Sequence, residues 1–142
     1  MRKTPSSVLC QAWDSFEEAV QQSQDRPSEK TVHQLRISTR RLEATLTVVQ
    51  GLGVAHKAKK ILNKLQDIRD TVGDLRDTQV SKTLWNEGHP TEAKGFQVKL
   101  KRKRKKLKRK VGTYLGGLSL DREHTYVKNI ISLLKDRETK MA

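Results

Sequence analysis

One short segment of the sequence carries residue types that bind anions. His33, Arg36 and Arg40 follow one another at spacings of three and four residues, so on a helix they lie within about 60° of one another. An arginine guanidinium can hold two oxygens of a phosphate with paired hydrogen bonds, which a lysine cannot do. The other side of this helix would carry a buried stripe of Val32, Leu35, Thr39, Leu42, Leu46 and Val49. The segment therefore predicts a helix with one buried face and one basic, anion-binding face, unless the basic face is simply solvated.

A second basic face is expected on the following helix. Lys57, Lys60 and Lys64 repeat the spacing of three and four, so a continuous helix would place them on one side. Two adjacent helices that each present a basic stripe could line a shared groove. An anion bound there would favour the protonated form of His33.

The strongest charge feature is the run from Lys99 to Lys110, in which ten of twelve residues are lysine or arginine. This run supplies most of a formal net charge of +14, which indicates a polyanionic partner such as a nucleic acid, an anionic membrane or a phosphate polymer. Binding should depend steeply on salt, and the absence of aromatic residues within the run disfavours a platform for stacked bases. A nonspecific electrostatic surface is the alternative. The candidate contacts in the run are Lys99, Arg102, Lys103, Lys106, Arg109 and Lys110.

Signals for other chemistry are weak. An acidic stripe consists of Asp67, Asp70, Asp74 and Asp77. It could hold a hard cation only if the carboxylate oxygens converged on one point. The alternative, which we favour, is that these carboxylates orient nearby arginine side chains. His56, His89 and His124 are dispersed and show no zinc-binding spacing, and no nucleophile–base set or glycine-rich phosphate loop is visible. We expect no metal, no cofactor and no catalysis, with phosphoryl chemistry that uses His33 as the weaker alternative.

Length and composition predict a single domain over residues 1–142. Hydrophobic residues make up 34% of the chain and only six residues are aromatic, so the core should be aliphatic. Cys10 is the single cysteine, which excludes an internal disulfide. No apolar run is long enough for a signal peptide or a membrane span, so the expected location is the cytoplasm.

Apolar periodicity predicts helices throughout. The first runs from Pro5 to about Gln24 with Thr4 as its cap, and its buried stripe is Leu9, Trp13, Phe16 and Val20. The second is capped near Ser28 and ends at residues 51–53, where two glycines stop it. The third begins near Val54, buries Ile61, Leu65, Ile68, Val72 and Leu75, and passes through Gly73, where we expect a close helix crossing.

A turn over residues 86–90 should separate the third helix from a fourth that Thr91 caps. The fourth helix carries the basic run, frays near Gly112 and at residues 116–117, and has a thin apolar stripe of Phe96, Leu100, Leu107, Val111, Tyr114 and Leu118. A fifth helix, capped by Ser119 or Asp121, buries Val127, Ile130, Ile131 and Leu134. The expected fold is all-α, an antiparallel bundle of four to five helices, with a core of about 4–118 and a C-terminal helix of about 119–140.

Two motifs together resemble the CHAD family, the histidine-containing α-helical domains. The first reads Val32-His33-Gln34-Leu35-Arg36-Ile37-Ser38-Thr39-Arg40-Arg41-Leu42, and the second reads Val72-Gly73-Asp74-Leu75-Arg76-Asp77. The family pattern has a histidine, an arginine three residues later and then an arginine pair on one helix, followed by Gly-x-x-Arg-Asp on a later helix. Both elements match in order, and the resemblance covers about residues 4–118.

The resemblance implies a helical bundle, one CHAD-like repeat, whose basic surface binds inorganic polyphosphate and is often associated with polyphosphate granules. By position, the resemblance assigns to the anion-binding surface His33, Arg36, Arg40 and Arg41. It makes Gly73, Arg76 and Asp77 a packing and orienting element. Family members usually contain two such halves around a common basic channel, whereas this chain has one, so two copies could form a homodimer that completes the channel.

The function that these observations favour is non-enzymatic polyphosphate binding in the cytoplasm, at polyphosphate granules. Lys57, Lys60 and Lys64 would extend the track of contacts, and the Lys99–Lys110 run would add attraction and further sites. The alternative is a basic helical module that binds nucleic acid, and nonspecific nucleic-acid binding could accompany either function. A module that brings a partner protein to granules is a further possibility.

Overall fold

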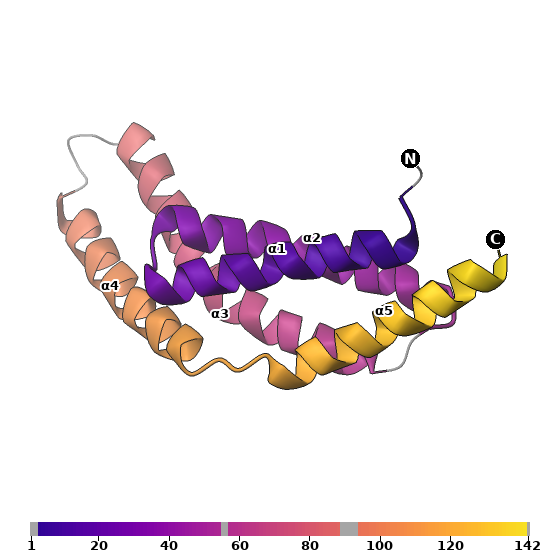
Figure 1. The fold of residues 1–142 in the computed structure, drawn as a ribbon. Coiled ribbons are helices and arrows are strands. Elements are labelled where there is room, and N and C mark those ends of the chain that lie inside the picture. Colours follow the sequence, from indigo (N-terminus) through magenta and orange to yellow (C-terminus); the bar gives the residue numbers. More distant parts are fainter. Residues whose placement is uncertain (1–2, 55–56, 89–93, 142) are drawn as a thin grey trace.

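The computed structural model confirms the all-α fold. It describes residues 3–54, 57–88 and 94–141, and within these ranges the side chains of 74–88, 94–98, 100 and 141 are not described. The helices of this described part are α1 (Pro5–Asp25), α2 (Glu29–Gly51), α3 (Ala58–Gly88), α4 (Lys94–Gly116) and α5 (Asp121–Met141) (Figure 1). No strand is present in these ranges.

The starts of α1 and α2 are fixed by local hydrogen bonds, as predicted. Thr4 is the N-cap of α1: its side-chain oxygen accepts a bond from the Ser7 backbone N–H at 3.3 Å, and Pro5 occupies the first helical position, where its missing N–H costs nothing. Ser28 caps α2 through a reciprocal pair of bonds with Thr31, of 2.8 and 3.1 Å. These caps satisfy backbone donors that a helix start leaves free.

The core is built from the apolar stripes that the spacing predicted, and the predicted stripe of α1 is buried in full. All five helices contribute to one cluster. Its largest fully buried side chains are Phe16, Leu9, Leu35, Leu42, Leu46, Ile61, Leu65, Ile68, Leu115, Ile130 and Leu134. Burial of this apolar area is the main force that holds the bundle together.

Within the described ranges, helix α2 packs against α1 and α3, and α4 packs against α3, whereas α5 packs against α1 and α3 rather than against its neighbour in the chain, α4. Figure 1 shows that the chain ends lie at the same end of the molecule, where the Ser6 hydroxyl donates to the Glu138 carboxylate at 2.7 Å. At the other end, α3 and α4 extend past the turn between α1 and α2 (Figure 1). Among the residues that the structure describes, the basic helix α4 packs against α1 and α3 and no other helix.

The boundaries of α3 differ from the prediction. The helix starts at Ala58 rather than near Val54, because the chain first has to turn through left-handed conformations at Gly53 (φ +80°) and Lys57 (φ +59°). It continues to Gly88, where a turn was predicted from residue 86, since no proline interrupts it before residue 90. The proposed Thr91 cap lies outside the described residues.

The glycines inside helices behave differently from expectation. Gly73 lies within α3, as predicted, but a Cβ atom built there would meet nothing within 4 Å, so no close helix crossing explains it. Gly112 does not fray α4, because the helix continues through it to Gly116. The flanking Val111 and Leu115 are both fully buried, and this packing offsets the low helix propensity of glycine.

Candidate functional site

Helix α2 presents His33, Arg36 and Arg40 along the side that faces α3; we call these three residues the arginine flank. The direction is set by Glu43, which lies about 20° from Arg36 around the helix. The Glu43 Oε2 atom contacts Arg69 Nη1 of α3 at 2.9 Å. His33 and Arg40 are exposed, whereas Arg36 is half-buried. The predicted basic face is therefore present, and it borders the seam between α2 and α3.

Arg36 has an unsatisfied donor. Its Nε atom is buried and has no hydrogen-bond partner, and the neighbouring Glu43 Oε1 atom is in the same state. Buried polar atoms almost always have partners, and leaving a charged donor without one is costly. Because this Nε atom is shut off from solvent, the groups of the flank that an anion can reach are those of the exposed His33 and Arg40 and the accessible part of the half-buried Arg36.

The register of α2 and α3 brings the two sequence motifs to the same level. The two helices are antiparallel neighbours, and the contact between Glu43 and Arg69 fixes their alignment. Arg36 lies seven residues before Glu43, and Arg76 lies seven residues after Arg69. Because the two helices run in opposite directions with the same rise per residue, Arg36 lies roughly level with Arg76. The side chains of Arg76 and Asp77 lie outside the described set, so their orienting role stays a prediction.

The three lysines predicted to line a groove together with the arginine flank do not lie beside it. Lys57 precedes α3, and its Nζ atom lies 4.6 Å from the ring centre of Tyr126 in α5. Lys60 and Lys64 lie about 180° and 140° from Arg69 around α3, on the other side of the buried stripe. The structure therefore does not bring these lysines into a common groove with the arginine flank, because the buried stripe of α3 lies between Arg69 and both Lys60 and Lys64 and the Lys57 side chain lies against α5. Their part in anion binding stays a prediction.

The basic face of α4 is open, as predicted. All of its candidate contacts are exposed: Lys99, Arg102, Lys103, Lys106, Arg109 and Lys110. Sequence reasoning missed Arg104, which is half-buried. Its spacing from Leu107 and Val111, three and seven residues, places it on the inward side of α4. That spacing was a usable signal in the sequence.

Arg41 points away from the arginine flank. It lies about 140° from Arg36 around α2 and lines a hollow between α1 and α2 together with Glu18 and Ser38. Its assignment to the anion-binding surface came from the resemblance alone and stays a prediction. The geometry groups it with α1 rather than with α3.

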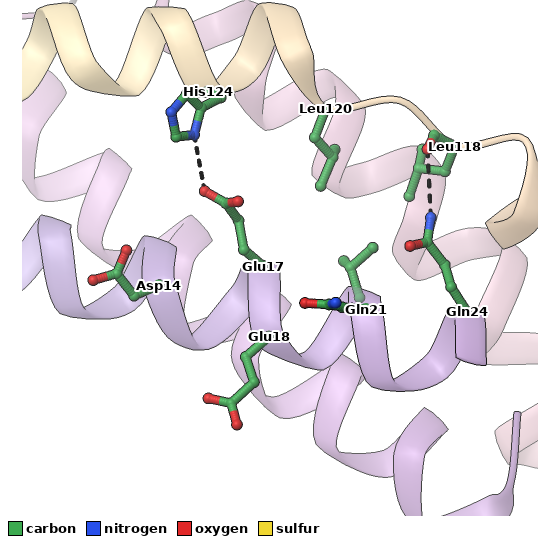
Figure 2. Close-up of a pocket in the computed structure, with 9 residues that line it drawn as sticks. Asp14, Glu17, Glu18, Gln21, Gln24, Leu118, Leu120 and His124 are labelled. Carbon is green, nitrogen blue, oxygen red and sulfur yellow. Dashed lines mark hydrogen bonds and ion pairs between the residues drawn. The ribbon is translucent and has the colours of Figure 1, made fainter. Parts of the chain in front are cut away.

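A separate hollow of about 640 Å³ lies on the other side of α1, facing α5 (Figure 2). Glu17 reaches across it, and its Oε1 atom lies 2.9 Å from His124 Nδ1; the Trp13 indole Nε1 lies 3.3 Å from the same ring nitrogen, which donates to Glu17 in one tautomer and accepts from Trp13 in the other. Gln24 closes the far end by donating to the Leu115 carbonyl at 2.7 Å. These bonds join segments 91 to 111 residues apart, so no local sequence signal could have found them.

The described part of the chain offers little for other chemistry. It contains no group of three or more His, Cys, Asp or Glu residues arranged to hold a metal ion. It also contains no helix long and apolar enough to cross a membrane. The pKa of Tyr114 is raised above its ordinary value of 10.0, first by burial and then by the charges of Asp67 and Glu123. This places the Asp67 carboxylate of α3 near α4.

Comparison with known protein families gives one match, between the CHAD domain and residues 9–133. The matched segment includes both motifs described above and reaches into α5. The comparison with curated proteins and the comparison with solved structures gave no match.

Proposed function

The chain belongs to the CHAD domain family, and we propose that it binds inorganic polyphosphate without altering it chemically. The CHAD domain is associated with polyphosphate. The observation that carries the proposal is the arginine flank itself, in which the half-buried Arg36 and the exposed His33 and Arg40 lie on one side of α2. Phosphate oxygens bound at the flank would accept hydrogen bonds from the guanidinium groups of Arg36 and Arg40.

Different basic residues would have different roles. Arg36 and Arg40 can each hold two phosphate oxygens, and His33 can donate a ring N–H beside them. The exposed lysines and arginines of α4 would attract the polymer over a longer range. Because polyphosphate repeats the same charge along its length, many moderate contacts in any register can sum to high affinity.

Titration of labelled polyphosphate at about 0.15 M salt, with duplex DNA and RNA as competitors, tests the proposal. The variant His33→Ala/Arg36→Ala/Arg40→Ala should bind polyphosphate about tenfold or more weakly, since each arginine–phosphate contact is a charge-assisted hydrogen bond. A matched control, Arg122→Ala/Lys128→Ala/Lys135→Ala, removes at least as much charge from exposed positions of α5. It should change the affinity far less.

The exposed run on α4 favours a second candidate, nucleic-acid binding. Sequence-independent contacts to a nucleic-acid backbone need only such a row of cations. If DNA or RNA competes as well as polyphosphate, and the α2 and α5 variants lose affinity equally, the charge of α4 accounts for binding and the arginine flank is not a site.

The proposal includes the absence of catalysis and a cytoplasmic location at polyphosphate granules. Incubation of polyphosphate with the protein and Mg²⁺ or Mn²⁺ should release no shorter chains or free phosphate. Released product would show instead that the protein is an enzyme acting on phosphate polymers. A fluorescent fusion should co-localise with granules, and the α2 triple variant should lose that co-localisation.

A further inference from the structure

A groove runs along the outer side of the seam between α1 and α2. It consists of three adjoining hollows: Ser15 and Arg41 line both the first and the second, and Val8 and Thr45 line both the second and the third. The groove follows most of the length of both helices. It lies away from the arginine flank, which faces α3.

Exposed aliphatic side chains concentrate in this groove. Four large hydrophobic residues are exposed in the described part of the chain, and three of them line the groove: Val8, Ile37 and Val48, at 37%, 39% and 64% exposure. The fourth is Leu133 on α5, at 45%. Apolar side chains gathered on one surface are typical of a contact site for another protein surface.

The charges that line the groove are of both signs and are not paired with each other. Arg41 shares one hollow with Glu18 and the next with Asp14, yet the structure contains no ion pair between Arg41 and either carboxylate. Glu18 accepts a bond from the neutral Gln22 side chain. A surface that carries an unpaired cation and unpaired carboxylates can form ion pairs with the same surface of a second copy of the chain.

We propose that this groove is the contact surface for a second copy of the chain. A two-fold axis that runs along the groove sets α1 of each chain against α2 of the other, a self-complementary arrangement. Val8 and Val48 lie at the same level of the groove, and so do Asp14 and Arg41. The axis therefore brings Val8 against Val48 of the partner subunit, and Arg41 beside Asp14 and Glu18 of the partner subunit.

Electrostatics favours this surface over the rest of the molecule. Two chains of charge +14 repel each other, but the groove itself is lined by two acidic residues, Asp14 and Glu18, and two basic residues, Lys3 and Arg41. This surface therefore adds little repulsion, and salt at about 0.15 M screens the distant charges beyond about 8 Å. The inference does not depend on the proposed ligand, although a dimer would present two arginine flanks to one polymer.

Sedimentation equilibrium of the full chain at about 0.15 M salt tests the proposal. The wild-type protein should have the mass of two chains, and Val48→Asp should shift it to the mass of one chain, because a carboxylate would be buried against Val8. Leu133→Asp, which places the same charge on the exposed aliphatic of α5, should leave the two-chain mass unchanged. Helix content by circular dichroism identifies variants that fail to fold.

A charge reversal provides the second test. Arg41→Glu should weaken the dimer, because it places like charges against Asp14 and Glu18, and Asp14→Lys/Glu18→Lys should weaken it in the same way. Combining the three substitutions should restore the two-chain mass. A wild-type mass of one chain at every concentration, failure of the combined variant to restore association, or dissociation by Leu133→Asp would each overturn the proposal. Polyphosphate binding, titrated separately, distinguishes this failure from failure of the proposed function.

Discussion

Helices α1 and α4 have opposite charges and different roles in the bundle. Helix α1 contains four acidic residues and no basic residue, whereas α4 contains eleven basic residues and no acidic residue. Eight residues of α1 are buried, while the described basic residues of α4 are exposed except for Arg104. Both segments form helices and both bury an apolar stripe in the core, so the apolar stripe rather than the charge decides the place of each helix in the fold.

The contrast extends to how each helix is held. Two polar contacts join α1 to α5: Ser6 donates to Glu138, and Glu17 contacts His124. The polar side chains of α1 therefore help to hold α5 against the bundle. The cations of α4 repel one another along the helix, and burial of Val111 and Leu115 anchors its C-terminal half. We therefore expect substitutions in α1 to change stability and substitutions on the basic face of α4 to change binding.

The largest effect should come from the core face of α1. Phe16 is fully buried, and Phe16→Ala should lower the free energy of unfolding by about 3–5 kcal/mol. Leu107→Ala, at a half-buried position of α4, should cost about 1 kcal/mol. Urea denaturation followed by circular dichroism measures both, and equal losses would contradict the distinction between the two helices.

The polar tie between α1 and α5 should have the next largest effect. Both oxygens of Glu138 accept bonds from Ser6, one from its backbone N–H at 2.9 Å and one from its hydroxyl. Glu138→Ala leaves the buried Ser6 backbone N–H without its acceptor and the Ser6 hydroxyl with only the Thr4 hydroxyl at 3.2 Å, so unfolding should require about 1–3 kcal/mol less. Asp136→Ala, at an exposed position of α5, is the control and should stay within about 0.5 kcal/mol of wild type.

Neutralising the basic face of α4 should change binding more than folding. The variant Arg102→Gln/Lys106→Gln/Arg109→Gln should make the logarithm of the polyphosphate affinity less dependent on the logarithm of salt concentration. The slope should fall by about 0.7–0.9 for each phosphate that the variant no longer neutralises. The free energy of unfolding should change by about 0.5 kcal/mol or less. An unchanged slope, equal to that of Arg122→Gln/Lys128→Gln/Lys135→Gln on α5, would show that α4 does not contact the polymer.

The smallest effect concerns Tyr114, where α4 meets the acidic side of α3. Asp67→Asn should lower the Tyr114 pKa towards 10.0 but leave it raised, because burial is the larger cause. A group with a raised folded-state pKa contributes stability that is present below its unfolded value, here about 10.0, and lost as the pH rises through the folded value. Tyrosinate absorbance, corrected with Tyr114→Phe, measures the pKa. Asp70→Asn is the control, and a shift as large as that of Asp67→Asn would remove the assigned cause.

Local sequence signals predicted the elements that local physics controls. Thr4 and Ser28 were found because helix caps depend on one side chain and the next turn. The buried stripes followed from spacing, because a helix that packs on one face must repeat its apolar residues every three or four positions. Arg104 could have been found in the same way, as a member of the stripe of Leu107 and Val111.

The remaining parts of the site depend on partners distant in the sequence. Lys57 lies on Tyr126 and His124 lies against Glu17, and neither pair has a spacing that could be recognised along the chain. The direction of Arg41 was also undetermined, because the spacing of α2 separates its faces without stating which neighbour each face meets. The contact between Glu43 and Arg69 identified the α3 side, and the shared hollow with Glu18 identified the α1 side.

The sequence by itself determined that the chain is helical, which residues each helix buries, and that the protein is a strongly basic member of the CHAD family. These properties depend on residue type, periodicity and total charge, which are all present in the linear chain. Only the tertiary structure decided that Arg36 keeps an unpartnered donor and that Val8, Ile37 and Val48 gather in one groove. Whether a donor finds a partner, and whether exposed side chains form one surface, depends on the distances between several helices. Packing sets those distances, and the linear sequence does not state them.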